Sequence, residues 1–359
     1  MHTINTVVER ISMMKNNHKW MAHLKSCEKQ VEVPIKSLSS DMQKEIKEYY
    51  SHFGFKNVRT DWHRYIYSVS GVCIPTFLPE DFFHNILERS YNNKMMYCAW
   101  EDKAFMKFIL NSVRFPETIY TNVNGYYFDK FGNMISKRTA KELMKKTGSV
   151  FAKPTIRSGG GNSALLIEDG DCEKIFTNLK KNYIVQEKII QSKETATLNP
   201  SSVNTVKVVS FLFKGEVYIL SAIMRVGAEN AITDAAAGGK GYFLGINKDG
   251  TSTDYGMNVF GKRRYNDHLG SSLKGRSIPH YNEICTIIKK AHKHFPYFGF
   301  MSWDFCINEK NEVILIEYNT GYPVAMVYQM VNGPLLGDMT EIVLKDVRNR
   351  INHSVNSSL

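Results

Sequence analysis

The sequence lacks the closely spaced cysteines that bind zinc or cross-link small secreted domains. Its six cysteines are scattered, and the two nearest, Cys285 and Cys306, stand 21 residues apart. It also lacks an apolar run long enough to span a membrane, and its N-terminus has no uninterrupted apolar segment of the kind that directs secretion. These absences favour a cytoplasmic protein with reduced thiols and no membrane span.

Two common nucleotide-binding patterns are missing as well. No G-x-G-x-x-G follows a predicted strand, and no G-x-x-x-x-G-K-[ST] occurs. A Rossmann domain is therefore disfavoured. The many hairpin signals favour an α+β protein over a doubly wound parallel sheet.

The composition is that of a folded globular protein. The chain has 359 residues, of which 43% are hydrophobic and 23% charged; this length suits about two to three structural units. The net charge of +11 favours acidic partners such as nucleotides, carboxylates, nucleic acid or an anionic membrane face. The densest basic cluster, residues 262–264, has few aromatic residues around it, so we expect a solvated patch and no nucleic-acid partner.

Hydrophobic periodicity predicts helices first and strands later. Capping boxes predict helix starts at Ser40, with Gln43, and at Thr139, with Glu142. The predicted strands cover 150–153, 164–168 and 183–187, then a hairpin over 206–213 and 216–224, and a second hairpin over 305–307 and 313–318. Helices are expected near 281–295 and 335–350.

A lysine at the end of a predicted strand is followed by a glycine-rich segment. The strand over 150–153 ends at Lys153, and Gly159, Gly160 and Gly161 come shortly afterwards. Glycine backbones can approach phosphates closely and present N–H groups, while a lysine supplies a point charge. The pattern is typical of a phosphate-binding loop, and it is equally consistent with a glycine hairpin beside a surface lysine.

Two acids and an amide come from the second predicted hairpin. Glu317 and Asn319 are two residues apart, so a strand turns both side chains to one face. An even-length turn would place Asp304 on that same face, opposite or nearly opposite Glu317. Opposed carboxylates repel unless a cation lies between them, and oxygen ligands suit Mg²⁺ that bridges phosphates. Alternatively, these acids lie on a solvent-exposed strand face and have no functional role.

A third apolar strand carries polar groups at its end. The strand over 183–187 ends in Gln186 and Glu187, and Ile189 and Glu194 follow it. The backbone there could hydrogen-bond an adenine edge, and a carboxylate could bind ribose hydroxyls. By itself this segment indicates little.

Together, and in this order, the three segments resemble the ATP-grasp superfamily. The 13 residues from Asp304 to Glu317 are similar to that family's spacing. Further segments resemble the sugar-transfer-associated ATP-grasp subgroup, which occurs with capsule and exopolysaccharide biosynthesis genes and is related to the teichuronopeptide type. These segments are Asp102-Lys103, Asn124-Gly125-Tyr126, residues 199–207 and residues 238–241, and the resemblance covers roughly residues 35–345.

The resemblance implies an α+β ATP-grasp fold, in which two α+β subdomains grip ATP, with a mainly helical domain before them. The expected division is an N-terminal helical and irregular domain at 1–98, a small subdomain at 99–187, a large subdomain at 188–349 and a flexible tail at 350–359.

The resemblance also implies roles for individual residues. Lys103 and Lys153 would hold the nucleotide phosphates under the loop Gly159–Gly161, Gln186, Glu187 and Ile189 would meet the adenine, Glu194 would bind the ribose, and Asp304, Glu317 and Asn319 would bind Mg²⁺. Lys153, Lys207, Arg225 and Lys240 would act on the reacting groups. Lys207 stands where the family usually has arginine. Lys240 lies in a segment, 235–241, that is typical of a mobile lid that brings the lysine onto phosphate and equally of a structural turn with an exposed lysine.

The function implied is that of a Mg-ATP-dependent carboxylate–amine ligase that works through an acyl phosphate. Its substrates would be an amine and a carboxylate, on a sugar, a glycan precursor or an amino acid. Two alternatives remain open: a kinase on the same fold, and a non-catalytic ATP-binding partner of a glycosyltransferase, docked to that enzyme or to a membrane face. Whether phosphate is released or stays on the acceptor distinguishes the first two.

Overall fold

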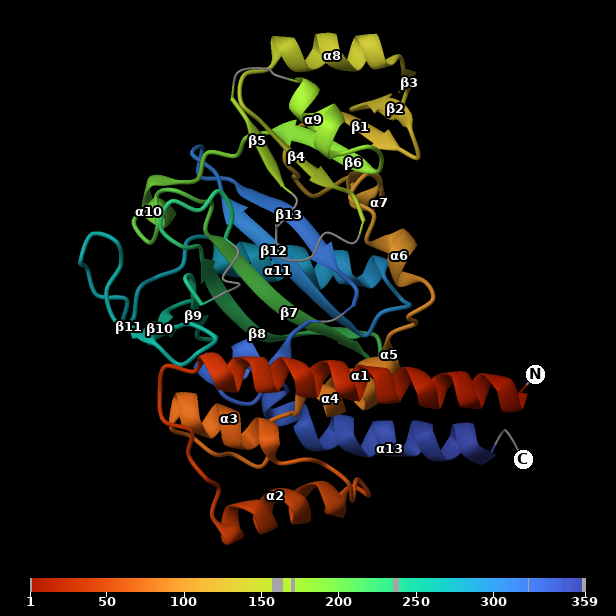
Figure 1. Ribbon diagram of the computed structural model, residues 1–359, viewed down its shortest axis with the longest axis vertical. Coiled ribbons are helices and arrows are strands. Elements are labelled where there is room, and N and C mark those ends of the chain that lie inside the picture. The colour runs from red at the N-terminus through yellow and green to blue at the C-terminus, as the bar shows by residue number, and fades with distance from the viewer. Residues whose placement is uncertain (1, 157–163, 169–171, 235–238, 322, 357–359) are drawn as a thin grey trace.

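The computed structural model describes residues 2–156, 164–168, 172–234, 239–321 and 323–356. It contains two antiparallel sheets and a layer of N-terminal helices, which Figure 1 shows from top to bottom as small sheet, large sheet and helices. Both sheets carry helices, so the chain is an α+β protein, as expected. Among the described residues, no helix is long and apolar enough to cross a membrane.

The small sheet has six strands in the order β3-β2-β1-β6-β4-β5. Its strands are β1 Thr118–Val123, β2 Tyr126–Asp129, β3 Met134–Ile135, β4 Val150–Pro154, β5 Leu165–Ile167 and β6 Tyr183–Glu187. The helices α8 (Lys137–Lys146) and α9 (Cys172–Asn178) cover one face, where Met144 and Ile175 are fully buried against Tyr120 and Val185. β4 begins with an alternation of buried and half-buried residues, whereas the first four residues of β6 are all buried.

The large sheet has seven strands in the order β11-β10-β9-β8-β7-β12-β13. Its strands are β7 Thr205–Phe213, β8 Glu216–Val226, β9 Tyr242–Ile246, β10 Ser252–Met257, β11 Arg263–Arg264, β12 Phe300–Ile307 and β13 Val313–Asn319. The β7–β8 hairpin turns at Lys214 and Gly215, whose positive φ angles of 51° and 85° suit the tight turn that joins right-twisted strands. The predicted first hairpin is therefore confirmed.

The two faces of the large sheet pack against different helices. On one face, α11 (Tyr281–Ala291) buries Ile284 and Ile288 against Trp303 and Leu315. Part of the other face packs on the N-terminal and C-terminal helices, where Phe211 lies in one hydrophobic cluster with residues such as Trp62, Phe83, Tyr328 and Leu344. The remainder of that face is polar, and it holds the site described below.

The N-terminal and C-terminal segments are helical. Their helices are α1 His2–Gln30, α2 Ser40–His52, α3 Asp61–Ser70, α4 Glu80–Phe82, a π-helix Phe83–Leu87, α5 Glu88–Tyr91, α6 Tyr97–Trp100, α7 Met106–Ile109, α12 Ala325–Asn332 and α13 Thr340–Asn356. The short helix α10 (Lys193–Ala196) precedes β7, and single 3₁₀ turns occur at His292–His294 and Gly337–Met339.

Two local predictions need correction. The cap of α2 is Ser39, not Ser40, because the Ser39 side chain accepts the N–H of Met42. The cap of α8 is Ser136, not Thr139, and it accepts the N–H of Thr139 instead.

The predicted tail at 350–359 is helical as far as it is described, because α13 continues to Asn356. There Arg350 pairs with Asp346 one turn earlier, and Ile351 is half-buried against the core.

Candidate functional site

A row of charged side chains crosses three neighbouring strands of the large sheet. Lys207 of β7 is the Cα partner of Asp304 of β12, and Asp304 is in turn the partner of Glu317 of β13. Residues directly opposite one another in antiparallel strands point to the same face. The polar part of this face therefore carries a cation and two carboxylates side by side.

Each carboxylate of the row has a lysine beside it. The Lys207 Nζ donates to both Asp304 oxygens, at 2.5 and 2.9 Å. The Lys103 Nζ, from the segment between α6 and α7, lies 3.1 Å from Glu317 Oε2. Burial alone would raise the pKa of Glu317, but Lys103, Lys153 and Lys207 outweigh it and lower that pKa to about 2. Burial raises the pKa of Asp304, although Lys207 opposes the change.

Lys153 approaches this row from the small sheet. It lies on β4, and its ammonium group is close enough to Glu317, Lys103 and Asp304 to feel their charges. Burial lowers the pKa of Lys153 to about 8, because the attraction of Glu317 compensates the lost hydration only in part. The two sheets thus bring three lysines and two carboxylates to one place.

Arg225 adds a guanidinium group to the same face. It is the Cα partner of Thr205 at the start of β7. Its Nε lies 3.6 Å from Asp234 Oδ2, and Asp234 also accepts a hydrogen bond from the Thr205 hydroxyl. Burial acts to lower the pKa of Arg225, but the charges of Asp234 and Asp304 raise it overall. Arg225 is thus a fixed cation beside the row.

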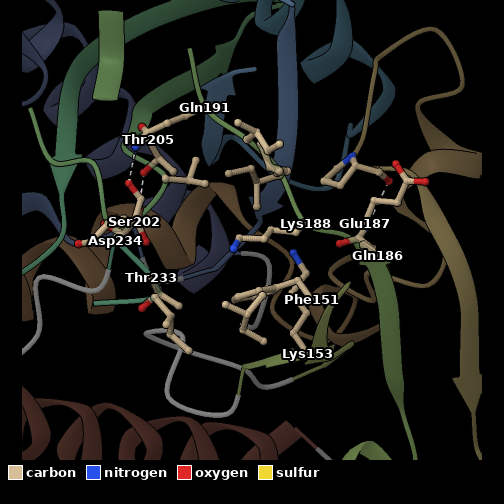
Figure 2. A pocket seen from close by; sticks show the side chains of 18 of the residues that line it. Phe151, Lys153, Gln186, Glu187, Lys188, Gln191, Ser202, Thr205, Thr233 and Asp234 are labelled. Carbon is tan, nitrogen blue, oxygen red and sulfur yellow. Dashed lines mark hydrogen bonds between the residues drawn. The ribbon is translucent and has the colours of Figure 1, made fainter. Parts of the chain in front are cut away.

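A cavity of about 440 Å³ lies where the two sheets meet. Figure 2 shows Phe151 and Lys153 of β4, Gln186 and Glu187 of β6, and Asp234 around it. Apolar side chains such as Leu166, Ile189 and Ile316 line it together with these polar groups. Its size falls within the range of ligand pockets, which is about 300 to 1,000 Å³.

The end of β6 borders this cavity with backbone groups. The N–H of Glu187 donates to Glu117 O at 2.9 Å, and the N–H of Lys188 donates to Ser149 O at 3.0 Å. In the described part of the chain, the N–H of Ile189 has no such partner, although Ile189 lines the cavity. A planar heterocycle there could accept this hydrogen bond while it contacts apolar walls.

Some predicted site residues do not join the others. Glu194 is exposed on α10 and does not line the cavity. Lys240 is exposed and lines a different cavity, at the edge of the large sheet. The predicted loop Gly159–Gly161 lies outside the described residues.

Several residues near the site escaped the sequence analysis. Phe151, Leu166 and Ile316 form apolar walls, and only their place on strands beside Lys153 and Glu317 could have indicated this. Asp234 lies in a loop without a motif. Glu101 stands next to the noted Asp102-Lys103 pair, and its carboxylate accepts the N–H groups of two residues that directly follow Asn319.

The two carboxylates of the row, together with the side-chain amide of Asn319, suit a magnesium ion that also binds phosphate. Asn319 lies two residues beyond Glu317 on β13, and its side-chain amide has no hydrogen-bond partner among the described residues. No cluster of three His, Cys, Asp or Glu side chains suited to a metal occurs in that part of the chain. Mg²⁺ often takes only one or two protein carboxylates and completes its shell with phosphate oxygens and water.

Comparison with solved structures finds similar proteins at low sequence identity and low TM-score. The similar structures include biotin carboxylase from Campylobacter jejuni (16% identity, 71% of this chain and 46% of that chain) and D-alanyl-alanine synthetase A from Vibrio cholerae (14%, 70% and 65%), each with a TM-score of 0.43. The ATP-grasp ligase PsnB, bound to its precursor peptide and AMPPNP, gives 12% identity, 72% and 62% coverage and a TM-score of 0.43. This chain spans less than two thirds of each of these proteins.

Sequence comparison is more decisive. No curated protein matches the chain significantly. The family of sugar-transfer associated ATP-grasp proteins, in contrast, matches residues 83–345, which include both sheets and every member of the charged row. The chain therefore belongs to the sugar-transfer associated ATP-grasp family.

Proposed function

We propose that this protein is a Mg-ATP-dependent ligase that joins a carboxylate to an amine through an acyl phosphate. The observation that carries the proposal is the charged row of Lys207, Asp304 and Glu317, which lies beside a cavity of nucleotide size and opposite Lys153. Membership of an ATP-grasp family supports the same reading.

ATP would bind in the cavity between the sheets. The adenine would lie between apolar walls that include Phe151 and Ile316, with the Ile189 N–H as a donor to its edge. The phosphates would then point toward Lys153 and Lys103, which are the cations at that end. Gln186 and Glu187 border the adenine in this arrangement.

Asp304, Glu317 and Asn319 would hold magnesium. The ion would supply positive charge to the β- and γ-phosphates, which lowers the cost of bringing a second anion to them. Lys207 lies against Asp304 and Lys103 lies against Glu317, so these lysines would offset the repulsion between the opposed carboxylates.

The chain's own residues would act by position and charge, without a covalent intermediate on the protein. A carboxylate oxygen of the substrate attacks the γ-phosphorus, and ADP leaves. Amine nitrogen then attacks the acyl carbon, phosphate leaves, and the amine loses its proton to solvent. Arg225 would hold the substrate carboxylate, and Lys153 and Lys207 would offset the charge of the transferring group.

The proposed substrate class is suggested by the description of the family and not by the shape of the cavity. A carboxylated sugar, a glycan precursor or an amino acid in cell-surface polysaccharide biosynthesis fits the description of the family as sugar-transfer associated. The net charge of +11 suits such an anion. A contact with a glycosyltransferase or a membrane face belongs to the same proposal.

The test is ³¹P NMR of the purified protein with Mg-ATP, a pool of amines and a pool of uronic acids or their nucleotide derivatives. A ligase releases ADP and free phosphate only when both pools are present. A phosphate ester on the acceptor would instead make the protein a kinase. ATP binding without turnover under any pairing would favour the non-catalytic partner of a glycosyltransferase.

A further inference from the structure

A second cavity, of about 520 Å³, lies at the edge of the large sheet. It is lined by four cations, which are Lys240, Lys262, Arg263 and Arg264, and by two acids, which are Glu32 and Glu229. Glu32 lies two residues beyond the C-terminal end of α1, so the N-terminal region and the sheet edge build this cavity together. Figure 1 shows that end of α1 close to β9 and β10.

Cations outnumber acids by two in the lining of this cavity. Lys262 lies 3.6 Å from Glu32, and both side chains are exposed. Among the described residues, Lys240, Arg263 and Arg264 have no acid within ion-pair distance. Such a concentration of unpaired cations in a concave surface attracts anions more strongly than the same charges spread over a convex one.

Both arginines are held in place by contacts that leave part of each guanidinium group available. Arg263 stacks on the Tyr255 ring at 4.4 Å and donates through one Nη to Ser70 O at 2.9 Å. Arg264 lies over the Tyr242 ring at 5.1 Å and donates through Nε to Asn266 O at 3.0 Å. A fixed guanidinium fork loses little entropy when it binds a phosphate or carboxylate in bidentate fashion.

The floor of the cavity is rigid. Asn258 is buried and donates to Glu32 Oε1 at 3.0 Å and to Gly239 O at 2.8 Å, while its own oxygen accepts the N–H groups of Phe260 and Lys262. Gly261 has a φ of +89°, and a side chain there would meet Val69 at 3.0 Å. The loop thus needs glycine at the turn that precedes Lys262.

The two cavities share one segment of the chain. Thr233 and Asp234 line the cavity between the sheets, whereas Glu229 and Lys240 line the basic cavity, and all four lie between β8 and β9. A ligand in the basic cavity would therefore contact the connection whose middle borders the proposed nucleotide site.

We propose that the basic cavity binds a phosphate or carboxylate group of a substrate other than ATP. This site lies outside the cavity between the two sheets, which we call the nucleotide cavity. The identification of the ligand as a substrate rests on the proposed function. Anion binding itself does not, because it follows from the cations of the cavity alone. Lys240, which the resemblance placed at the reacting phosphate, belongs to this second anion site.

The test is isothermal titration calorimetry of the full chain with two probes. Fructose 1,6-bisphosphate is the phosphate probe and propane-1,2,3-tricarboxylate is the carboxylate probe, each added with and without saturating Mg-AMPPNP. We expect one equivalent of at least one probe to bind whether or not the nucleotide is present. The tighter of the two probes identifies the chemistry of the natural group.

Two double variants remove equal charge from different places. Arg263→Gln with Arg264→Gln should weaken probe binding about tenfold or more. Lys248→Gln with Lys289→Gln removes two cations from another surface cavity and should change binding less than twofold. Melting temperatures of both variants report whether they fold.

Three results would overturn the assignment: no binding of either probe, equal losses in the two double variants, or displacement of the bound probe by Mg-AMPPNP. Failure of the proposed function would look different. In that case Mg-AMPPNP would not bind the wild-type protein, while the probe would still bind to the protein without added Mg-AMPPNP.

Discussion

Asp304 and Glu317 face each other across β12 and β13 because the second strand carries one extra residue. The pairs Phe305 with Leu315 and Asp304 with Glu317 leave Ile316 without a partner, which makes a β-bulge. Without the bulge the loop of residues 308–312 would put Ile316 opposite Asp304. The bulge therefore brings the second acid to the site and turns Ile316 into a wall of the nucleotide cavity.

The first prediction concerns this acid pair. Glu317→Gln removes a negative charge that would hold magnesium, and we expect turnover to fall by about 100- to 1,000-fold, as is typical for the loss of one contact to developing charge. Asp304→Asn should behave in the same way. Release of phosphate from ATP, followed with the substrates that the NMR screen identifies, measures the effect.

The matched control is Glu312→Gln, one residue before β13 begins. Glu312 pairs with Arg114 at 2.8 Å and is partly exposed, so its loss removes an equal charge outside the site. Turnover in this variant should stay close to the wild-type value. Full activity in a folded Glu317→Gln protein would contradict the assignment of the metal site.

The strands that carry the site could be predicted from sequence because each contains a run of apolar, β-branched and aromatic residues, most of which are buried. The hairpin from β7 to β8 and the strand Tyr183–Glu187 appear where the apolar runs predict them. The convergence of Asp304 and Glu317 was also predicted, but for a different reason: an even-length turn was expected, and the structure has an odd loop with a bulge. Turn length and bulges depend on local backbone strain that composition does not report.

Residues brought in from distant loops could not be predicted. Asp234 lies beside Arg225 only because β8 and the connection after it fold back together. The exposure of Glu194 on α10 and the position of Lys240 in the basic cavity likewise depend on tertiary packing. The helix cap predicted at Ser40 was wrong by one residue, and the cap predicted at Thr139 was wrong by one turn. Ser39 and Ser136 have side chains that cap equally well, and they are the caps in the structure.

The second prediction concerns the pH dependence of nucleotide capture. Burial lowers the pKa of Lys153 to about 8, so this lysine is protonated below pH 8 and loses its charge above it. The kcat/KM for ATP, which reports groups of the free enzyme, should fall as the pH rises through about 8. Lys153→Arg keeps its charge in this range and should lack that fall, although its maximal activity will be lower.

The wild-type profile and the Lys153→Arg profile must be compared at constant ionic strength. The matched control is Lys188→Arg, since Lys188 also lines the nucleotide cavity but pairs with Glu168 at 3.0 Å. Its profile should match the wild type. A decline near pH 8 that persists in Lys153→Arg would assign the titration to another group.

The third prediction concerns Glu101 as a positioning residue. Its Oε1 accepts the N–H groups of Thr320 and Gly321 at 2.6 and 2.8 Å, which fixes the backbone directly after Asn319. Glu101→Ala should lower kcat by about 10- to 100-fold, as is typical when the support of a metal ligand is lost. The dissociation constant of ATP measured without magnesium should change little, because Glu101 does not line the nucleotide cavity.

Glu117→Ala provides the control for Glu101. Glu117 forms an exposed pair with Lys130 at 2.8 Å, and exposed pairs contribute little to stability. Its kcat should remain near the wild-type value. If Glu101→Ala weakened ATP binding as much as it slowed turnover, Glu101 would be a direct contact or a general structural support and not a positioning residue for the metal set.

The last prediction concerns a buried ionic cluster in the N-terminal region. His84 lies between Glu80 (Nε2 to Oε2, 3.1 Å) and Glu88 (Nδ1 to Oε2, 2.8 Å), and all three side chains are buried. Burial acts to lower the pKa of His84, but the two carboxylates raise it overall.

The charged His84 ring therefore stabilises the fold fully below about pH 6.5, the ordinary pKa of histidine. This contribution is lost as the pH rises through the raised pKa of the folded state. His84→Gln should lower the free energy of unfolding by about 3 kcal/mol at pH 6, because it removes the cation beside the buried Glu80 and leaves Glu88 with Lys94 alone. Urea titrations at several pH values should show this difference shrinking as the pH rises above 6.5 and through the raised pKa of the folded state. A difference that stays constant over the whole range would mean that His84 is neutral in the folded protein.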